Sequence, residues 1–451
     1  MFINLGECLI RFRGSSYLGN MCEILKALRD PLIDIESDCF NNTNMEEILK
    51  AAEPTLTDMP VEIILKICSF LDSHFLKYSF SKVCQRFEDI LADDHLWKYW
   101  VQNKMNGCFP AIPNLNIYEE SEIDWEELCL ELDSEKKKWS DVKNTTKHII
   151  AKDAHYASVD AVLLLNKGGV CVSGGRDRSL ALWNVLEMNP EDSDLKPIRM
   201  RHDAHVGWIW DLAADNADCA AILYSASWDN TVKAWDLAAD FNCVETFKCG
   251  MSALSVVASD RTVMAGLYSN KVLSFDLRSG GNPISSYKAH KGPVLALSSH
   301  KNMVASISED KTLAIWDKVA GKIMRNNIKI SRDKQYPVCI NWTSTAMYIG
   351  DSVGFLHLFN PEDFTFVRSH TIWGATPVME PNHKIAGCYQ SNGNIIACSD
   401  QGQIKFLYNC HPPKEYSTIE TSTVSVTKLQ YMSGVLAVGT CETALEFWIP
   451  T

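Results

Sequence analysis

The chain has 451 residues, and its 56 acidic and 43 basic side chains give a formal net charge of −13. This balance disfavours binding to nucleic-acid phosphates, and no apolar stretch reaches the ~18 residues of a membrane span, so we expect neither nucleic acid nor a membrane as a partner. The 16 cysteines include no Cys-x-x-Cys pair and the first residues contain no secretory signal, which predicts reduced thiols in a cytoplasmic or nuclear protein.

A chain of this length exceeds one ordinary domain. We expect an N-terminal extension at 1–53, a helical module at 54–100, a linker with an acidic helix at 101–145 and a β-rich domain at 146–451. The extension contains segments compatible with short helices at 24–28 and 45–52, and we assign it no function.

The helical module is predicted by apolar residues that recur at helical spacing between 56 and 97. Thr57 or Asp58 can cap a first helix that has Pro60 near its first turn. A break between Phe70 and Ser73 then separates two helices. Taken alone, this pattern fits a small helical bundle that covers its own core.

The same segment resembles the F-box family. It opens with Met59-Pro60, where the family has a Leu-Pro-type dipeptide, and it closes with Leu96-Trp97. Met59 in place of Leu and Phe87 in place of the commoner Trp or Arg are departures from the family pattern. Between the two ends, the family-like positions are Glu62, Phe70-Leu71, Leu76 and Val83-Cys84.

The F-box resemblance implies binding to a Skp-type adaptor and, through it, to the core of a cullin-RING ubiquitin ligase. An amphipathic helix pair suits this role because it presents an apolar face to a partner groove. Some of the apolar side chains must instead form the internal core, and the pattern does not separate the two sets. The residues predicted to bind the adaptor are Met59, Pro60, Ile63, Ile64, Ile67, Leu71, Val83 and Cys84.

The linker is predicted to contain a helix within 117–144. Acidic residues come first and Lys136 to Lys138 come last, as the helix dipole favours. We interpret this helix as a solvated spacer, and the alternative is a rigid stalk that sets the distance between the modules. The residues compatible with one apolar stripe are Ile123, Trp125, Leu128, Leu132 and Trp139.

Seven related twelve-residue segments fill most of the remaining chain. Self-similarity at a spacing of 40 to 52 residues indicates a propeller or a solenoid. The segments are 173–184, 225–236, 265–276, 306–317, 349–360, 397–408 and 438–449. Each has an aromatic or leucine anchor, at Trp183, Trp235, Phe275, Trp316, Phe359, Leu407 and Trp448.

Within each segment, apolar and polar positions alternate after a turn, which predicts a strand leaving a tight hairpin. The repeats resemble the WD40 family, in which a His, a Ser, an Asp and a Trp form a hydrogen-bonded set that braces each blade. The first repeat has His155, Asp177 and Trp183, but Gly175 where the serine is expected. The complete sets that we predict are His205, Ser227, Asp229 and Trp235 in the second repeat, and His290, Ser308, Asp310 and Trp316 in the fourth.

The predicted fold is therefore multidomain, with a small all-α F-box module followed by an all-β seven-bladed WD40 propeller. The last repeat lacks an outer strand, and residues 148–151 ahead of the first repeat can supply it. Pairing the two ends of the propeller in this way would close the ring and remove exposed strand edges.

Ser, His and Asp recur together in the repeats, so a hydrolase triad must be weighed against a structural role. We favour the structural role because each set accompanies a Trp and recurs in successive blades, whereas triads are recognised by geometry and role. The sequence contains no phosphate-binding loop of the Gly-x-x-x-x-Gly-Lys type and no metal-ligand spacing of His and Cys. We expect a non-enzymatic protein without a cofactor or metal.

In the WD40 family, loops between the second and third strands line one face of the ring, which implies a binding surface for a target protein. Aromatic and Arg side chains suit such a surface. Trp208 can alternatively pack within a blade, and Arg176 can alternatively pair with a neighbouring acid. The residues predicted to bind the target are Arg176, Trp208, Trp228, Tyr268 and Glu309.

Together, the two resemblances imply a substrate-recognition subunit of an SCF-type cullin-RING E3 ubiquitin ligase. Such a subunit contributes proximity rather than a catalytic side chain. The alternative is a WD-repeat scaffold that acts independently of the ligase.

Overall fold

The computed structural model describes residues 2–5, 8–11, 56–112, 115, 123–190, 195–239, 241–259, 262–330, 335–373, 383–423 and 425–451. The chain divides into a helical unit, Met1–Lys104 with Asp124–Asp133, and a β unit, Met105–Ile123 with Ser134–Thr451. Near the N-terminus, β1 (Phe2–Leu5) pairs antiparallel with β2 (Cys8–Arg11). The helices expected at 24–28 and 45–52 lie outside the described residues.

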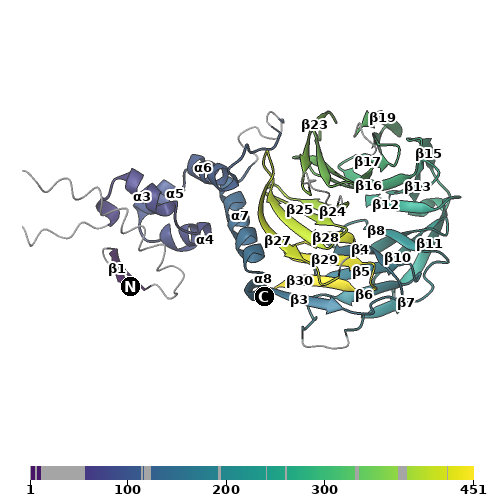
Figure 1. Cartoon of the computed structure of the whole chain (residues 1–451), viewed down its shortest axis with the longest axis horizontal. Coiled ribbons are helices and arrows are strands. Elements are labelled where there is room, and N and C mark those ends of the chain that lie inside the picture. Colours follow the sequence, from purple (N-terminus) through teal and green to yellow (C-terminus); the bar gives the residue numbers. More distant parts are fainter. Residues whose placement is uncertain are drawn as a thin grey trace, which may run out of the picture. The chain divides into compact units, whose positions relative to one another are not determined.

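The helical unit is built from short helices in quick succession (Figure 1). They are the 3-10 turn Leu56–Asp58, α3 (Val61–Cys68), α4 (Ser73–Phe75), the π turn Leu76–Phe80, α5 (Gln85–Leu91), α6 (Asp94–Met105) and the first residues of α7 (Trp125–Ser140).

The ends of the first two helices show one prediction confirmed and one wrong. The break predicted near Phe70 is present, and Asp72 caps α4 by accepting hydrogen bonds from the backbone N–H groups of His74 and Phe75. In contrast, α3 has Pro60 as its N-cap, with no side-chain hydrogen bond. The predicted cap by Thr57 or Asp58 was wrong because these residues form a separate 3-10 turn.

The core of the helical unit is apolar and aromatic. The rings of Phe80 and Phe87 stack with centroids 4.3 Å apart, and the indole N–H of the buried Trp97 donates to the backbone oxygen of Leu91. Since a buried indole N–H must be paired, this bond fixes the start of α6 against the end of α5. The buried apolar residues of the unit include Ile64, Cys68, Leu76, Phe80, Phe87, Leu91, Trp97, Val101, Leu128, Cys129 and Leu132.

Helix α7 corrects our interpretation of the linker as a solvated spacer. Its predicted apolar stripe is buried at Trp125, Leu128, Leu132 and Trp139. In the helical unit, Asp133 accepts hydrogen bonds from Ser73 and Lys104, and in the β unit, the ring of Trp139 stacks on Phe406. The helix was misjudged because its buried face is narrow and its other positions are charged.

The β unit contains seven four-stranded antiparallel sheets. The first comprises β4 (Val159–Leu165), β5 (Val170–Gly175), β6 (Leu180–Asn184) and β7 (Arg199–Arg201), and the second β8 (Ile209–Ala214), β9 (Ile222–Ser227), β10 (Thr231–Asp236) and β11 (Asn242–Lys248). The third comprises β12 (Ala253–Ser259), β13 (Thr262–Leu267), β14 (Lys271–Asp276) and β15 (Ser285–Lys288), and the fourth β16 (Val294–His300), β17 (Met303–Ser308), β18 (Thr312–Asp317) and β19 (Lys322–Lys329).

The remaining sheets follow the same order along the chain. The fifth comprises β20 (Pro337–Trp342), β21 (Met347–Asp351), β22 (Phe355–Phe359) and β23 (Phe366–Thr371), and the sixth β24 (Ile385–Gln390), β25 (Asn394–Ser399), β26 (Gln403–Tyr408) and β27 (Lys414–Glu420). The seventh comprises β28 (Val426–Met432), β29 (Val435–Thr440), β30 (Leu445–Pro450) and β3 (Thr146–Ala151), with the short α8 (Val142–Thr145) just ahead of β3.

The sheets form a closed seven-bladed propeller. The first strand of each blade contacts the first strand of the next, and β28 of the last blade contacts β4 of the first. The predicted closure is confirmed, since β3 pairs with β30 in the register Lys147 to Ile449 and Ile149 to Phe447 (Figure 1). This pairing removes the edge that β30 would otherwise expose.

The seven predicted anchors all lie on the third strand of a blade and are buried. They fill the space between blades: Trp235, for example, belongs to an apolar cluster with Leu165 and Val172 of the preceding blade. Each hairpin before an anchor strand has one residue in the left-handed backbone region. These residues are Arg178, Asn230, Asn270, Lys311, Gly354, Gly402 and Thr443.

Candidate protein-binding surfaces

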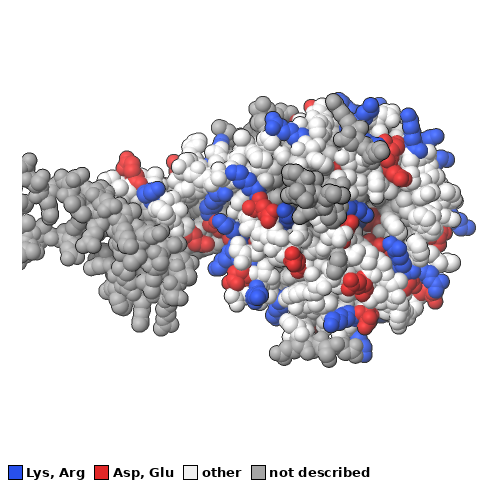
Figure 2. Space-filling view, viewed as in Figure 1, with Lys and Arg blue, Asp and Glu red and all other residues white. Residues whose placement is uncertain are grey.

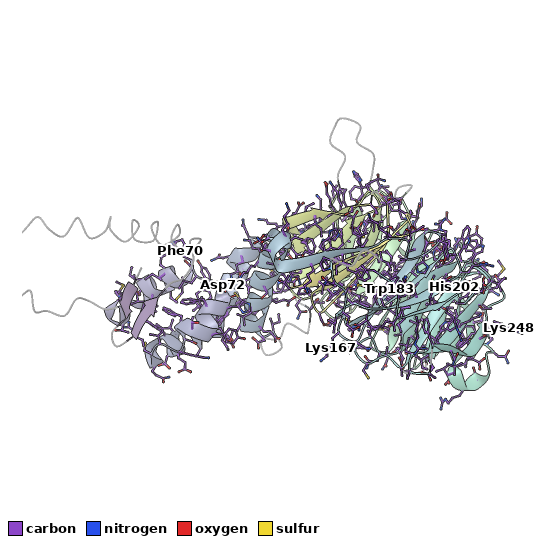
Figure 3. The ribbon with its side chains drawn as sticks, turned by 90° about the horizontal axis from the view of Figure 1, so that it is seen from below. Phe70, Asp72, Lys167, Trp183, His202 and Lys248 are labelled. Carbon is purple, nitrogen blue, oxygen red and sulfur yellow. The ribbon has the colours of Figure 1, made fainter. Side chains whose placement is uncertain are left out.

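Two blades contain a complete His-Ser-Asp-Trp hydrogen-bonded set. In the second blade, His205 lies 2.8 Å from Asp229 through Nδ1 and 2.7 Å from Ser225 Oγ through Nε2. The indole N–H of Trp235 donates to the same hydroxyl at 2.8 Å. Because the carboxylate only accepts, Nδ1 carries the proton and Ser225 donates to Nε2. The first blade repeats these bonds with His155, Ser173, Asp177 and Trp183 (Trp183 is labelled in Figure 3).

The serines in the predicted sets were therefore wrong. Ser225 and Ser306, not Ser227 and Ser308, contact the histidines, and the first blade has its serine at Ser173 although Gly175 stands two residues later. Ser227 and Ser308 instead accept hydrogen bonds from backbone N–H groups in the turn. Ser225 and Ser227 are two residues apart on β9 and therefore share one face of the strand. Ser225 is farther from the turn and lies diagonally across from Trp235.

The fourth blade uses a variant of this set. Thr312 is inserted between His290 and Asp310, with its hydroxyl 2.8 Å from His290 Nδ1 and 2.6 Å from the carboxylate. The ring of Trp316 stacks on Tyr287 with centroids 3.7 Å apart. A stacked aromatic pair therefore holds this anchor in the blade.

In the second blade, the pKa values of both His205 and Asp229 are shifted in the folded state. Burial lowers the pKa of His205 below its usual value, so the imidazole is neutral at pH 7. Burial alone would raise the pKa of Asp229, but hydrogen bonds from His205 and Thr231 outweigh it and hold that pKa well below its usual value. His205 and Ser225 are 1% and 0% exposed, so a substrate has no access to a group that otherwise has triad connectivity.

Four of the five residues predicted to bind a target come together on blades one to three. Arg176 lies over the ring of Trp208 at 5.1 Å, Trp208 lies 6.3 Å from Trp228, and Trp228 meets Tyr268 edge-on at 5.6 Å. Trp208, Trp228 and Tyr268 are each 39% to 50% exposed. Glu309 is exposed at the equivalent turn of blade four. We call Arg176, Trp208, Trp210, Trp228 and Tyr268 the aromatic patch.

Arg176 is already paired. Its guanidinium donates to Asp160 at 2.8 Å, which raises the pKa of Arg176, and it also lies over Trp210 at 5.7 Å. The alternative of pairing with a neighbouring acid is thus confirmed. The arginine is therefore held as a fixed cation beside the rings of Trp208 and Trp210.

The sequence reasoning missed further members of this surface. Trp210 lies on β8 and is 5.9 Å from Trp228. Val206 and Met251 are 82% and 43% exposed and stand in the loops that precede blades two and three. Val206 directly follows His205, and Met251 stands in the corresponding loop before blade three. This position relative to the histidine of the hydrogen-bonded set was the signal by which the sequence could have indicated them.

The inner strands enclose a central channel of about 710 Å³. Lys428 and Asp211 form an ion pair of 3.0 Å among its lining residues, although they belong to blades seven and two. Asp211 also accepts a hydrogen bond from the backbone of Val256 on blade three. The channel therefore contains polar bonds that tie distant blades together.

In the helical unit, the predicted adaptor-binding residues separate into two groups. Ile64 is fully buried, so its predicted contact with an adaptor was wrong and it belongs to the internal core. The other seven are at least partly accessible. Arg86 of α5 donates to the backbone oxygens of Thr57 and Met59, which holds Met59 beside the start of α5, where Val83 and Cys84 lie.

Helix α3 has accessible apolar residues on both sides of its buried stripe. At 100° per residue, Ile63 and Ile67 lie on one side of Ile64 and Cys68, and Val61 and Leu65 lie on the other. The second side borders a groove of about 670 Å³, formed with α5 and α6 and lined by Tyr99. Phe70, 50% exposed, follows at the end of α3 and is labelled in Figure 3.

Within the described ranges, no group of three or more His, Cys, Asp or Glu side chains is placed to hold a metal ion. None of the described helices is long and apolar enough to cross a membrane. On the face of the propeller drawn in Figure 2, basic and acidic side chains are interspersed.

Comparison with known proteins agrees with both modules. Residues 56–102 match the F-box-like family model, and residues 196–236 and 281–317 match the model of the WD domain, G-beta repeat. The chain is 30% identical over 347 residues to F-box/WD repeat-containing protein 9 of Bos taurus, covering 76% of this chain and 72% of the relative. The Homo sapiens protein of that name is 28% identical, covering 88% and 83%. F-box/WD repeat-containing protein mec-15 of Caenorhabditis elegans is 24% identical, covering 72% and 80%.

Proposed function

The chain belongs to the family of F-box/WD repeat-containing proteins, and on this basis we propose that it is a substrate-recognition subunit of an SCF-type cullin-RING E3 ubiquitin ligase. Its F-box would bind a Skp-type adaptor and its propeller a target protein. The protein would contribute no catalytic side chain, and the ligase would act by holding target lysines near the charged ubiquitin-conjugating enzyme.

The accessible apolar side of α3 is the observation that carries the adaptor half of this proposal. Ile63 and Ile67 are each half-buried on that side, and Met59 and Leu71, just before and after the helix, are also partly accessible. A fully exposed apolar side chain that becomes buried in a partner contributes about 1.5–3 kcal/mol, and a half-buried one about half of that. Several such residues suffice for specific docking of a helical face in a groove.

The test is capture of a purified Skp-type adaptor by the full chain. Ile67→Glu should reduce capture at least about tenfold, because a charge would be placed in an apolar contact. Val61→Glu is the matched control, since Val61 is 41% exposed on the opposite side of the same helix. The control should capture within about twofold of the unchanged chain, at a loss of less than ~0.5 kcal/mol.

Circular dichroism must show equal helicity in both variants, and Pro60→Ala/Leu71→Ala serves as a second variant if Ile67→Glu does not fold. If Val61→Glu loses capture and Ile67→Glu retains it, the groove beside Tyr99 is the adaptor surface and our residue assignment is wrong. If the unchanged chain captures no adaptor, the ligase-independent scaffold becomes the better proposal.

For the propeller half, we propose the aromatic patch with Glu309 as the surface that binds the target. Exposed Trp and Tyr side chains of the kind that dominate interface energetics are gathered there beside a fixed cation. Trp228→Ala/Tyr268→Ala should remove the targets recovered with the full chain by affinity mass spectrometry. Leu186→Ala, also an exposed apolar residue of the propeller, is the control that should retain them.

We further propose that the protein acts in the cytoplasm or nucleus, without nucleic-acid or membrane partners.

A further inference from the structure

The central channel of the propeller contains two adjacent thiols. Cys339 lies on β20 and Cys388 on β24, the innermost strands of the fifth and sixth blades. Their Sγ atoms are 3.6 Å apart, and one thiol hydrogen-bonds to the other. Both side chains are half-buried and line the channel, so a small solute can reach them.

The backbone leaves room for this pair. A methyl group added at Gly350 would lie 2.7 Å from the sulfur of Cys339, so a residue with a side chain there would displace the thiol. A disulfide bond is about 2.05 Å long, so the two sulfurs need to approach by roughly 1.5 Å. Rotation of the two side chains about their Cα–Cβ bonds would supply this movement.

The surroundings of the pair distinguish the two thiols, because they lower the pKa of one and raise the pKa of the other. The hydrogen bond with Cys388 is the main cause that lowers the pKa of Cys339, and Lys428 and Lys384 add to it, whereas the same bond and burial raise the pKa of Cys388. Cys398, on the next strand, is fully buried, and burial raises its pKa. The two neighbouring thiols therefore differ in pKa, and Cys339, the more acidic one, is suited to attack while Cys388 is placed to resolve.

We propose that Cys339 and Cys388 are a peroxide-reactive modification site that cross-links blades five and six by a disulfide. The Cys339 thiolate attacks one oxygen of hydrogen peroxide, the O–O bond breaks, and the departing hydroxide takes up a proton to leave as water. The Cys388 sulfur then attacks the sulfenic sulfur of Cys339 and displaces hydroxide, which leaves as water with the Cys388 proton. In sum, two thiols are oxidised to a disulfide while hydrogen peroxide is reduced to two molecules of water.

The two blades concerned lack part of the usual bracing. Their anchors are Phe359 and Leu407, whose side chains have no N–H to donate to a serine. The disulfide would join them at the innermost strands and would constrain the chain between positions 339 and 388 in the unfolded state. The oxidised propeller should therefore unfold at a higher temperature than the reduced one.

The experiment uses the full chain, reduced, desalted and exposed to limiting hydrogen peroxide before alkylation of the remaining thiols. Chymotrypsin cleaves after Tyr389 and so separates Cys388 from Cys398 for non-reducing mass spectrometry. The Cys339–Cys388 cross-link should form at least about tenfold faster than oxidation of the exposed lone thiols of Cys219 and Cys243. Its formation should raise the unfolding temperature.

Two variants make the mechanism testable. Cys388→Ser should leave a sulfenic acid at Cys339 that dimedone traps, whereas Cys243→Ser should cross-link at the unchanged rate. Oxidation of Cys219 and Cys243 at the same rate as the pair, coupling of Cys339 to a different cysteine, or survival of both channel thiols would each overturn the proposal. None of these outcomes depends on adaptor capture.

Discussion

Ser225 and Ser227 offer a direct test of what braces a blade, because they lie two residues apart on one face of β9 and are both fully buried. Only Ser225 contacts both His205 and Trp235. Ser225→Ala should lower the free energy of unfolding of the propeller by about 1–3 kcal/mol, because two buried polar groups lose their partner. Ser227→Ala should cost less, since it removes a single bond to a backbone N–H at 3.1 Å. Denaturant unfolding of the full-length variants measures the difference, and equal losses would contradict the assignment.

The stability of the propeller should fall on acidification, and the direction follows from the pKa shifts. The pKa values of His205 and His290 are lowered in the fold by burial, and burial and neighbouring charges bring that of His370 to about 4. Below the ordinary histidine value of about 6.5, the unfolded chain therefore binds protons that the folded chain does not. The lowered pKa of Asp229 extends this loss below about pH 4.

We expect the free energy of unfolding to decrease from pH 7 to pH 5. His205→Gln should be less stable at pH 7 but should show a shallower decrease with pH, since one titrating group is gone. Denaturant unfolding at several pH values gives the slope. An unchanged slope in the variant would mean that His205 is not one of the groups responsible.

For individual residues, the sequence predicted the right residue types of the His-Ser-Asp-Trp sets but not always the right positions. The histidines, aspartates and tryptophans follow from the repeat spacing, whereas the serine depends on which of two equivalent strand positions lies across from the Trp. That choice is made by the pairing of Lys233 with Ser225, a register that spacing alone does not determine. Ile64 was misassigned for a related reason, because the apolar stripe of α3 has accessible residues on both sides.

Among the structural elements, β3 has the largest expected effect on the propeller. Removal of residues 145–152 would leave the outer edge of β30 without a partner, while β29 still pairs with its other edge, and would expose an apolar edge that includes Phe447. The deletion should lower the unfolding temperature of the propeller and promote self-association through the open edge. Thermal unfolding and light scattering measure the two effects. An unchanged unfolding temperature would show that the seventh blade does not need its outer strand.

Most of this architecture was predictable from the chain because a propeller is a repeated local pattern. Alternation and turn residues predict the strands, and the anchor spacing predicts seven blades. Because the last repeat is one strand short, the sequence also predicts that a segment ahead of the first repeat supplies the outer strand of the last blade. Contacts between blades were not predictable. Cys339 and Cys388 meet only because β20 and β24 are neighbours on the inner wall, and Trp210 joins the aromatic patch because β8 turns it toward Trp228.

At the scale of the whole molecule, we expect adaptor capture and target capture to be separable. The helical unit and the propeller each have their own apolar core, so a surface change in one leaves the other folded. Ile67→Glu should lose the adaptor and keep the propeller's targets, and Trp228→Ala/Tyr268→Ala should do the reverse. Affinity mass spectrometry of both variants measures both activities in one experiment. Loss of both by either variant would contradict this independence.

The pairing of β3 with β30 also has a consequence for protein synthesis. β3 leaves the ribosome before every other strand of the propeller, yet its partner is made about 300 residues later. At 5–20 residues per second, roughly 15 to 60 seconds pass before the ring can close. During that interval the nascent propeller has two unpaired edges, and a chain interrupted before position 445 can never bury them. Premature termination late in the message should therefore produce a chaperone-bound, rapidly degraded product instead of a six-bladed protein.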